Sequence, residues 1–414
     1  SLLSQNLKHA ASLVYELPKL LGVTEKANYL MLFQNNNELR PTGGFIGSYA
    51  VITLENGTMT SLKIDDIYNP DGQIDEQGIT LSPPRPIADF LVEDRLYLRN
   101  ANWNPDFTVS AAVLSDLYTQ ITSTKIDGVI AIDLNFVESL LNVTGPVYLT
   151  AYNEEITAQN LYERTQLHSD FNYQEGVSQK KSFLTVLGSK LLERLTTLES
   201  EQTQNLVSSL ASSLDSRSLQ IYLDNSLVSD LLTQYKWDGS LVETDGDYLN
   251  IVNANLGGTK SNYWVEESYN YTVSSQTRDG LLRSTLTGLY QHTGTDSAWP
   301  GGPYTNYVRV VVPAGAKLTG ASLVYKDEPV SDIFENIIID QIQGYTSFET
   351  NFILQPQKSV ELVLQYDLPQ DLSITDINKQ YNLYMQKQAG AKDAEFEFNF
   401  NYPFGMNVAS QSPQ

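Results

Sequence analysis

The stretch that most constrains this chain is the run Phe33-Gln-Asn-Asn-Asn-Glu-Leu-Arg-Pro-Thr-Gly-Gly-Phe-Ile-Gly-Ser-Tyr49, which lies between two apolar, strand-like segments. Three asparagines, the Glu38/Arg40 pair and the Gly43-Gly44 step make it a polar loop that a plain sheet crossover does not need. Glycine lets another group approach the backbone closely, and loops held by rigid strands often carry sites. The run therefore predicts either a ligand-binding loop that uses Arg40, Gly43 and Gly44, or a tight, well-capped turn.

The residues around this run alternate strand and helix signals. Asn56-Gly57 supplies the positive φ angles of a type I′ turn, so a hairpin is expected around it. The nearly continuous apolar run 125–133 predicts a strand buried on both faces. Helices are expected at Ser110–Gln120, Asn135–Leu141, Gln179–Leu198, Asn205–Leu214 and Ser226–Tyr235, and a long loop at Asp65–Arg95. This alternation predicts a layered α/β domain over residues 1–256.

The second half of the chain changes character. From Asp247 onward the pattern is mostly alternating, with strands expected at Tyr263–Val273, Leu281–Tyr290, Tyr307–Val312, Ser359–Tyr366 and Glu395–Tyr402. Short strands separated by turn signals indicate an all-β, sandwich-like domain. We expect it to occupy residues 257–414, with the boundary near Gly257-Gly258.

Composition excludes several classes of function. The chain has 414 residues, with 26 basic and 49 acidic side chains and a formal charge of −23. Such a polyanion repels nucleic acid and anionic lipid headgroups, so nucleic-acid binding is not expected. The absence of cysteine excludes disulfides, thiolate nucleophiles and cysteine-based zinc sites.

The chain shows no membrane span of its own, since no stretch of 18 or more apolar residues occurs. It begins at Ser1 rather than Met, and Ser1 to Leu17 has the pattern of an amphipathic helix already in progress. We therefore expect that a tag, a signal or a membrane anchor precedes these residues in the natural protein.

Histidine chemistry has little support. The three histidines, His9, His168 and His292, are far apart in sequence and lack carboxylates at ligand spacing. A histidine metal site or a Ser-His-Asp triad is not expected, and His168 is expected to be an ordinary surface histidine. No phosphate-binding loop or dinucleotide-binding glycine pattern is present.

An acidic segment suggests a different ligand. Asp65, Asp66, Asp71, Asp75 and Glu76 fall close together in the expected long loop. Oxygen-rich loops suit calcium or magnesium, so this segment is the candidate metal site. The regular spacing of calcium loops is missing, and the alternative is a solvated acidic loop.

A second polar run, Leu96–Phe107, combines Arg99 with Trp103 and Asp106. Arg99 can form planar contacts with a carboxylate or phosphate, and Trp103 can stack on a sugar ring. In the alternative, Arg99 pairs with Asp106 and Trp103 fills the core beneath the loop. A similar aromatic and glycine-rich run, Ala298–Arg309, is expected to be a structural turn.

Four runs together resemble a bacterial family known only as a domain of unknown function. They are Phe33 to Phe45, Arg99-Asn-Ala-Asn-Trp-Asn-Pro-Asp106, Ile126-Asp-Gly-Val-Ile-Ala-Ile-Asp133 and Gly302-Pro-Tyr-Thr-Asn-Tyr-Val-Arg309. The resemblance implies a protein that follows an N-terminal membrane anchor and faces the outside of the cell.

The α/β half is also similar, more distantly, to the LytR-CpsA-Psr family, whose enzymes transfer lipid-pyrophosphate-linked glycopolymers onto peptidoglycan. This similarity implies functional roles for Asp65, Arg164 and Asp170. Arginines of that family fall here on Phe45, Ile64, Tyr173 and Gly176. Pyrophosphate needs paired cations in a site of low dielectric, so the losses argue against transfer unless Arg40 and Arg99 replace them.

These observations predict an exported, membrane-tethered protein of the cell envelope, located outside the cell. Its expected role is non-catalytic binding or structure, with a cell-wall glycopolymer recognised through Arg40, Arg99 and Trp103. One alternative is a divergent glycopolymer transferase that uses these arginines with Asp65, Arg164 and Asp170. Another is an extracellular adhesin or assembly subunit, which would make a homo-oligomer. Convergence of the arginines and Asp65 on one cleft would favour an enzyme or an anion-binding protein.

Overall fold

The computed structural model describes residues 15–168, 179–224, 226–275, 280–374 and 380–402. The chain divides into two compact units, Ser1–Leu241 with Gln388–Ala391, and Val242–Lys387 with Lys392–Gln414. The division precedes the expected boundary at 256/257, because strand β8 (Asp247–Asn255) belongs to a sheet of the second unit. Most of the amphipathic helix expected at the N-terminus lies outside the described residues.

The first unit is built on a five-stranded mixed sheet of order β3-β2-β1-β4-β7. Its strands are β1 (Ala27–Asn35), β2 (Phe45–Glu55), β3 (Thr58–Asp66), β4 (Gly128–Asp133) and β7 (Leu219–Leu223). β1 runs antiparallel to β2 and parallel to β4, which lies between β1 and β7. The position of β4 between two other strands, with helices on both faces of the sheet, explains its apolar sequence. The expected hairpin of β2 and β3 is confirmed, with φ of 53° at Asn56 and 77° at Gly57.

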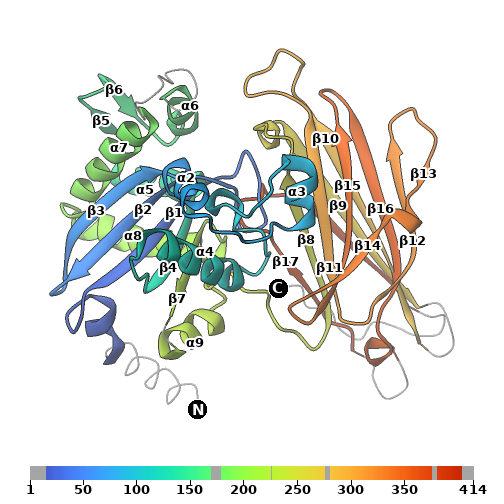
Figure 1. Ribbon diagram of the computed structural model, residues 1–414. Helices are drawn as coiled ribbons and strands as arrows, with labels where there is room; N and C mark the ends of the chain where they lie inside the picture. Colours follow the sequence, from blue (N-terminus) through green and yellow to red (C-terminus); the bar gives the residue numbers. More distant parts are fainter. Residues whose placement is uncertain (1–14, 169–178, 225, 276–279, 375–379, 403–414) are drawn as a thin grey trace. The chain divides into compact units, whose positions relative to one another are not determined.

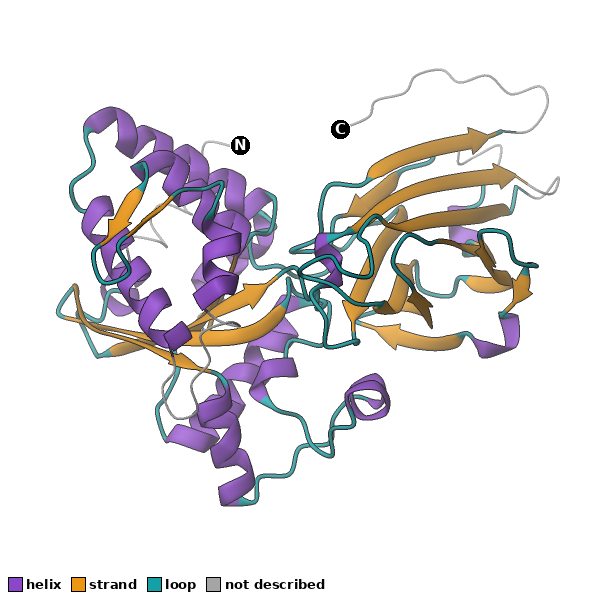
Figure 2. Ribbon diagram, turned by 90° about the horizontal axis from the view of Figure 1, so that it is seen from above, coloured by secondary structure: helices purple, strands orange, loops and turns teal. Residues whose placement is uncertain are grey.

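Helices cover both faces of this sheet (Figure 2), as the layered α/β prediction requires. The described helices of the first unit are α2 (Tyr68–Gln77), α3 (Arg85–Leu91), α4 (Phe107–Thr122), α5 (Leu134–Thr144), α6 (Leu161–Gln166), α7 (Gln179–Leu195), α8 (Ser200–Asp215) and α9 (Ser226–Gln234). Alternate residues of β1 face opposite layers. Leu30 and Leu32 pack with α4, whereas Met31 and Phe33 pack with α5 and α8. No helix among the described residues is long and apolar enough to cross a membrane.

The prediction of a long loop at Asp65–Arg95 is wrong, because this segment contains the helices α2 and α3. Within α2 only Pro70, Asp71 and Ile74 are buried, so the helix lacks the apolar stripe that would reveal it in the sequence. Gly78, with φ of 66°, ends α2 in a left-handed cap. A further departure is the short antiparallel ribbon of β5 (Val147–Leu149) and β6 (Glu154–Ile156), which is separate from the main sheet.

The second unit is rich in β-structure, as expected, and contains two sheets. The six-stranded sheet, in spatial order, comprises β13 (Ser331–Asp332), β12 (Lys317–Tyr325), β16 (Ser359–Asp367), β10 (Leu282–His292), β9 (Val265–Ser275) and β18 (Glu395–Asn401). The five-stranded sheet comprises β14 (Ile338–Ile342), β15 (Tyr345–Leu354), β11 (Tyr304–Val312), β8 and β17 (Leu383–Gln386).

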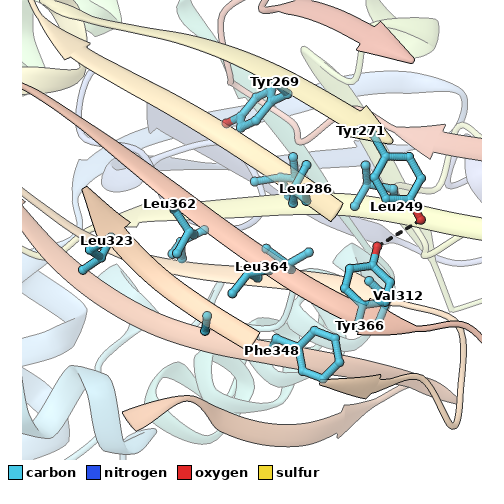
Figure 3. Close-up of a cluster of buried hydrophobic side chains, with 14 of the residues drawn as sticks. Leu249, Tyr269, Tyr271, Leu286, Val312, Leu323, Phe348, Leu362, Leu364 and Tyr366 are labelled. Atoms are coloured by element: carbon cyan, nitrogen blue, oxygen red, sulfur yellow. Dashed lines mark hydrogen bonds between the residues drawn. The ribbon is translucent and has the colours of Figure 1, made fainter. Parts of the chain in front are cut away.

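The two sheets of this unit share one hydrophobic core, which makes the arrangement a β-sandwich. Figure 3 shows Leu286 and Leu364 of the six-stranded sheet near Leu249 and Phe348 of the five-stranded sheet. Buried tyrosines add hydrogen bonds to this core. The Tyr366 hydroxyl donates to the Tyr271 oxygen at 3.1 Å (Figure 3).

Candidate functional site

The loop between β1 and β2 is closed by its own backbone. Glu38 N–H donates to the Asn35 carbonyl at 3.0 Å, and Phe45 N–H donates to the Glu38 carbonyl at 2.8 Å. Gly43 has φ of 137°, and a Cβ on Gly44 would collide with the backbone of Asn35. Both glycines are therefore required by the conformation and packing of the loop itself.

The group that approaches Gly43 closely is another part of the same unit. A Cβ on Gly390 would overlap the Gly43 carbonyl, and the Gln388 side chain donates to the Arg40 carbonyl at 3.1 Å. The segment Gln388–Ala391 thus packs on the loop. In the structure, the close approach that glycine permits is used by the chain's own backbone.

Arg40 lies inside the protein, with 1% of its surface exposed. Its Nη2 lies 3.0 Å from Glu38 Oε1, and its Nε donates to Asn100 Oδ1 at 3.2 Å. The guanidinium also lies 5.5 Å from the centroid of the Phe45 ring. Arg40 is not on a surface from which it could contact a dissolved ligand.

Arg99 is engaged by two carboxylates. Its Nη1 lies 2.9 Å from Asp71 Oδ2, and its Nη2 lies 2.8 Å from Glu93 Oε1. The guanidinium is 3.9 Å from the centroid of the Tyr97 ring. The acidic partners differ from the Asp106 partner considered in the sequence, because η1 (Leu98–Asn100) places Arg99 toward α2.

Asn100 joins the two arginines into one cluster. It accepts a hydrogen bond from Arg40, and its Nδ2 donates to Glu93 Oε1 at 3.1 Å. We call Glu38, Arg40, Asp71, Glu93, Arg99 and Asn100 the arginine cluster. Its five ionisable members are two arginines and three acids.

The environment of the arginine cluster shifts the pKa values of Asp71 and Arg99. Burial raises the pKa of Asp71 to about 6, although the nearby Arg99 charge and its hydrogen bond lower it. Burial also lowers the pKa of Arg99, but the charges of Glu93 and Asp71 outweigh that effect and raise it. Arg99 therefore stays protonated, and its charge is balanced by these two neighbouring acids.

A layer of amides holds the same loop from other elements. Gln34 on β1 donates to the Thr42 carbonyl at 3.0 Å and accepts from Asn102 at 2.7 Å. Asn102 also donates to the Gly44 carbonyl at 2.8 Å, and Gln220 on β7 donates to the Thr42 carbonyl at 2.8 Å. Buried backbone acceptors need such partners, so these amides stabilise the loop.

The other predicted members of the second run also have structural contacts. Asp106 caps α4 by accepting from Thr108 N–H at 3.0 Å, and it accepts from Leu241 N–H at 3.1 Å. Trp103 is half-buried beside this turn. Capping by Asp satisfies free backbone donors at the start of a helix.

The predicted metal site at Asp65, Asp66, Asp71 and Asp75 gains no support from the described residues. They contain no group of three or more acidic or histidine side chains that could hold a metal ion. Formation of α2 separates the carboxylates into different contacts. Asp65 accepts from Asn69, Asp71 pairs with Arg99, and Asp75 accepts from the Tyr97 hydroxyl.

Arg164 lies in another region of the first unit, where α6 and the β5–β6 ribbon meet. Its Nη1 is 3.9 Å from Glu154 Oε1, and His168 Nε2 is 3.1 Å from Glu154 Oε2. His168 is buried and stacks on Phe183, so the expectation of a surface histidine is wrong. Asp170 lies outside the described residues.

The structure therefore brings Arg40 and Arg99 together and pairs Arg40 with Glu38, as the sequence suggested, but it adds partners that the sequence did not indicate. Glu93 and Asn100 complete the arginine cluster, whereas Gln220 and Gln388 hold the loop from distant parts of the chain. The local signals for this cluster were the Glu38/Arg40 spacing and the position of Asn100 beside Arg99. Contacts from Gln220 and Gln388 depend on tertiary structure.

Residues 24–168 match the family model described as "Protein of unknown function (DUF4012)". This region contains both Phe33–Tyr49 and Leu96–Phe107, although it covers less than half of the chain. No curated protein matches the chain in sequence.

Several solved structures align with about half of the chain. Protein gbs0355 from Streptococcus agalactiae is 14% identical with a TM-score of 0.33, covering 53% of this chain and 76% of its own. TagV from Bacillus subtilis is 11% identical with a TM-score of 0.29, covering 52% and 80%. The structure titled "TagT bound to LI-WTA" is 10% identical with a TM-score of 0.23, covering 52% and 75%.

Proposed function

We propose that this chain is a non-catalytic protein of the bacterial cell envelope that binds a neutral part of a cell-wall glycan. The observation that carries the non-catalytic part is the pairing of Arg40 with Glu38 and of Arg99 with Asp71 and Glu93. These are the two arginines that would have to replace the missing cations of a glycopolymer transferase. Both are held by carboxylates of the same unit.

The cost of using these arginines for a pyrophosphate supports this proposal. A pyrophosphate entering the arginine cluster would have to displace Asp71 or Glu93 from Arg99. The displaced carboxylate would remain in a site of low dielectric without its cation, which is strongly unfavourable. The same pairing disfavours anion recognition through Arg40 and Arg99, so a glycan would bind elsewhere on the chain.

The net charge supports a neutral glycan rather than an anionic one. A chain with a formal charge of −23 repels polyanionic polymers at long range. Sugar hydroxyls and the apolar faces of sugar rings can be bound without compensating charge. An extracellular position, with tethering by a membrane anchor outside this chain, follows from the resemblance of the four sequence runs to anchored, outward-facing proteins.

Two assays on the purified chain test this proposal. The first is co-sedimentation with peptidoglycan sacculi stripped of their anionic polymers, in which we expect the protein in the pellet. The second is incubation with a labelled polyprenyl-pyrophosphate disaccharide, magnesium and a peptidoglycan acceptor, in which we expect no transfer. Transfer of label would overturn the non-catalytic role. Absence of the protein from the pellet would overturn glycan binding and leave the assembly or adhesin role.

A further inference from the structure

The five-stranded sheet of the second unit ends in a strand that has no neighbour on its outer side among the described residues. This strand, β14, pairs antiparallel with β15 and is the last strand in the order of the sheet (Figure 1). The two strands are joined by the two-residue turn Gln343-Gly344, whose φ angles of 47° and 83° are those of a type I′ hairpin. β14 is therefore an open edge of the sheet.

The hairpin turn fixes which backbone groups of β14 face outward. In a two-residue hairpin the closing pair, here Ile342 and Tyr345, exchanges hydrogen bonds, and every second residue before it does the same. Ile339 and Gln341 therefore direct their N–H and C=O groups away from β15. In agreement with this, the Gln341 N–H donates to Asp340 Oδ1 at 2.8 Å. The outer edge of β14 thus offers the backbone groups of Ile339 to a further strand.

The side chains on both faces of this edge are apolar and exposed. Ile338 is 45% exposed and Ile339 is 58% exposed. Successive residues of a strand point to opposite faces, so the two isoleucines stand on the two sides of the edge. Exposed apolar side chains on an open edge favour pairing with another strand, and larger exposed apolar patches mark interaction surfaces.

The edge and the segment that leads into it are acidic. Residues 327–340 hold no basic residue and five exposed acids, which are Asp327, Glu328, Asp332, Glu335 and Asp340. With the preceding Lys326, the stretch 326–340 carries five acids and one lysine, a net charge of −4. Glu335 is five residues from Asp340, so at most about 18 Å of backbone separates them. A strand of seven residues is about 23 Å long and passes both carboxylates.

A buried cation lies in the same sheet, but an acid of the sheet balances it. Arg309 on β11 is 3% exposed and lies opposite Glu349 of β15. Burial lowers the pKa of Arg309, and the charge of Glu349 opposes that shift more strongly than the charge of Asp340 does. Glu349 is therefore the main acidic neighbour of Arg309, and the exposed Asp340 faces solvent, where an incoming cation can reach it.

We propose that β14 binds an extended, cationic peptide segment of another protein, which adds a strand to the sheet at Ile339 and sets basic side chains against Asp340 and Glu335. In strand addition the backbone hydrogen bonds give affinity, and the side chains at alternate positions give specificity. A second copy of this chain fits poorly, because two edges with the same acidic charge repel each other. This surface is separate from glycan binding and does not depend on it.

Fluorescence anisotropy of a labelled Lys-Val-Lys-Val-Lys-Val-Lys peptide, in about 0.15 M salt to screen distant charges, tests this surface. We expect saturable binding that Asp340→Lys weakens about tenfold or more, because the variant replaces an attraction with a repulsion. The matched control is Glu361→Lys, which makes the same change of charge at an exposed position of β16, a strand with neighbours on both sides. This control should bind within about threefold of the unchanged chain, because its charge is screened from the edge.

A second peptide separates strand addition from general attraction to an acidic chain. Replacement of its central valine by proline keeps all four lysines but prevents a continuous strand, so it should bind about tenfold more weakly or less. Circular dichroism and thermal melting of each protein variant check that it is folded.

Four results would overturn the proposal. They are no binding of the first peptide at millimolar concentration, equal affinities of the Asp340→Lys and Glu361→Lys variants, and equal affinities of the two peptides. The fourth is a dimer of the unchanged chain in sedimentation velocity that Ile339→Pro abolishes, since this would assign the edge to a second copy.

Discussion

The carboxylate of Asp71 lies 2.9 Å from the guanidinium of Arg99 and accepts Leu98 N–H at 2.8 Å. This contact ties α2 to η1 and gives Arg99 an internal partner. Because Asp71 is 2% exposed, separating the pair leaves a buried charge without its cation. The same contact thus explains both the stability of this region and its poor suitability for an anionic ligand.

Arg99→Ala should lower the free energy of unfolding by about 3–5 kcal/mol, because it leaves both Asp71 and Glu93 without their cation. Chemical denaturation followed by circular dichroism measures this loss. The matched control is Arg85→Ala, which removes an exposed pair with Asp89 on α3 and should change stability by about 0.5 kcal/mol or less. Equal losses of unfolding free energy in the two variants would contradict a larger contribution from the buried ion pairs of Arg99.

Gly44→Ala should destabilise the first unit by about 1–3 kcal/mol or more, since its Cβ would collide with the backbone of Asn35. Gly72→Ala is the matched control, because Gly72 lies within α2 and a Cβ there meets nothing within 4 Å. That control should be neutral or stabilise by up to about 1 kcal/mol. Melting temperatures check this: we expect a fall in Gly44→Ala and no fall in Gly72→Ala, and an unchanged melting temperature in Gly44→Ala would contradict the close approach to Asn35.

The second unit should lose stability as pH rises through the titration of Asp247. Burial raises the pKa of this carboxyl to about 6, although hydrogen bonds from Tyr271, Tyr381 and the Tyr248 backbone lower it. The folded state then holds the proton more tightly than the unfolded state, whose value is about 4. The free energy of unfolding therefore falls from about pH 4 to about pH 6, by up to about 3 kcal/mol for this group.

Asp247→Asn tests this pH dependence because it removes the titrating group. We expect the difference in unfolding free energy between pH 4 and pH 6 to shrink in this variant. The control Asp296→Asn changes an exposed carboxyl and should leave the pH profile as it is in the unchanged chain. A slope that is the same in all three proteins would contradict a role for Asp247.

The sequence predicted elements whose signals are local. Asn56-Gly57 predicted the hairpin through its turn angles, and the apolar run ending at Asp133 predicted the buried strand β4. It missed α2 because that helix buries only three residues, which is too few for an apolar stripe. The expectation of a long acidic loop followed from that error.

The candidate site could be predicted only in part, for a similar reason. The sequence placed Arg40 and Arg99 in unusual polar runs, and the structure brings both into one cluster. Only Glu38 could be read from spacing, because Glu93 meets Arg99, and Gln388 meets the Arg40 carbonyl, only after the chain has folded. A pair of arginines in a polar loop looks the same in sequence whether it binds a ligand or the protein's own acids.

The most direct test of the central claim, that the arginine cluster is internal structure, is a titration of the chain with inorganic pyrophosphate and magnesium. A ligand that binds only the folded state raises its stability by about 2.7 kcal/mol at a hundred times its dissociation constant. With Arg40 and Arg99 paired to carboxylates, we expect no heat of binding and no change in melting temperature at millimolar pyrophosphate. Saturable binding that stabilises the unchanged chain and is lost in a folded Arg99→Lys variant would contradict the account.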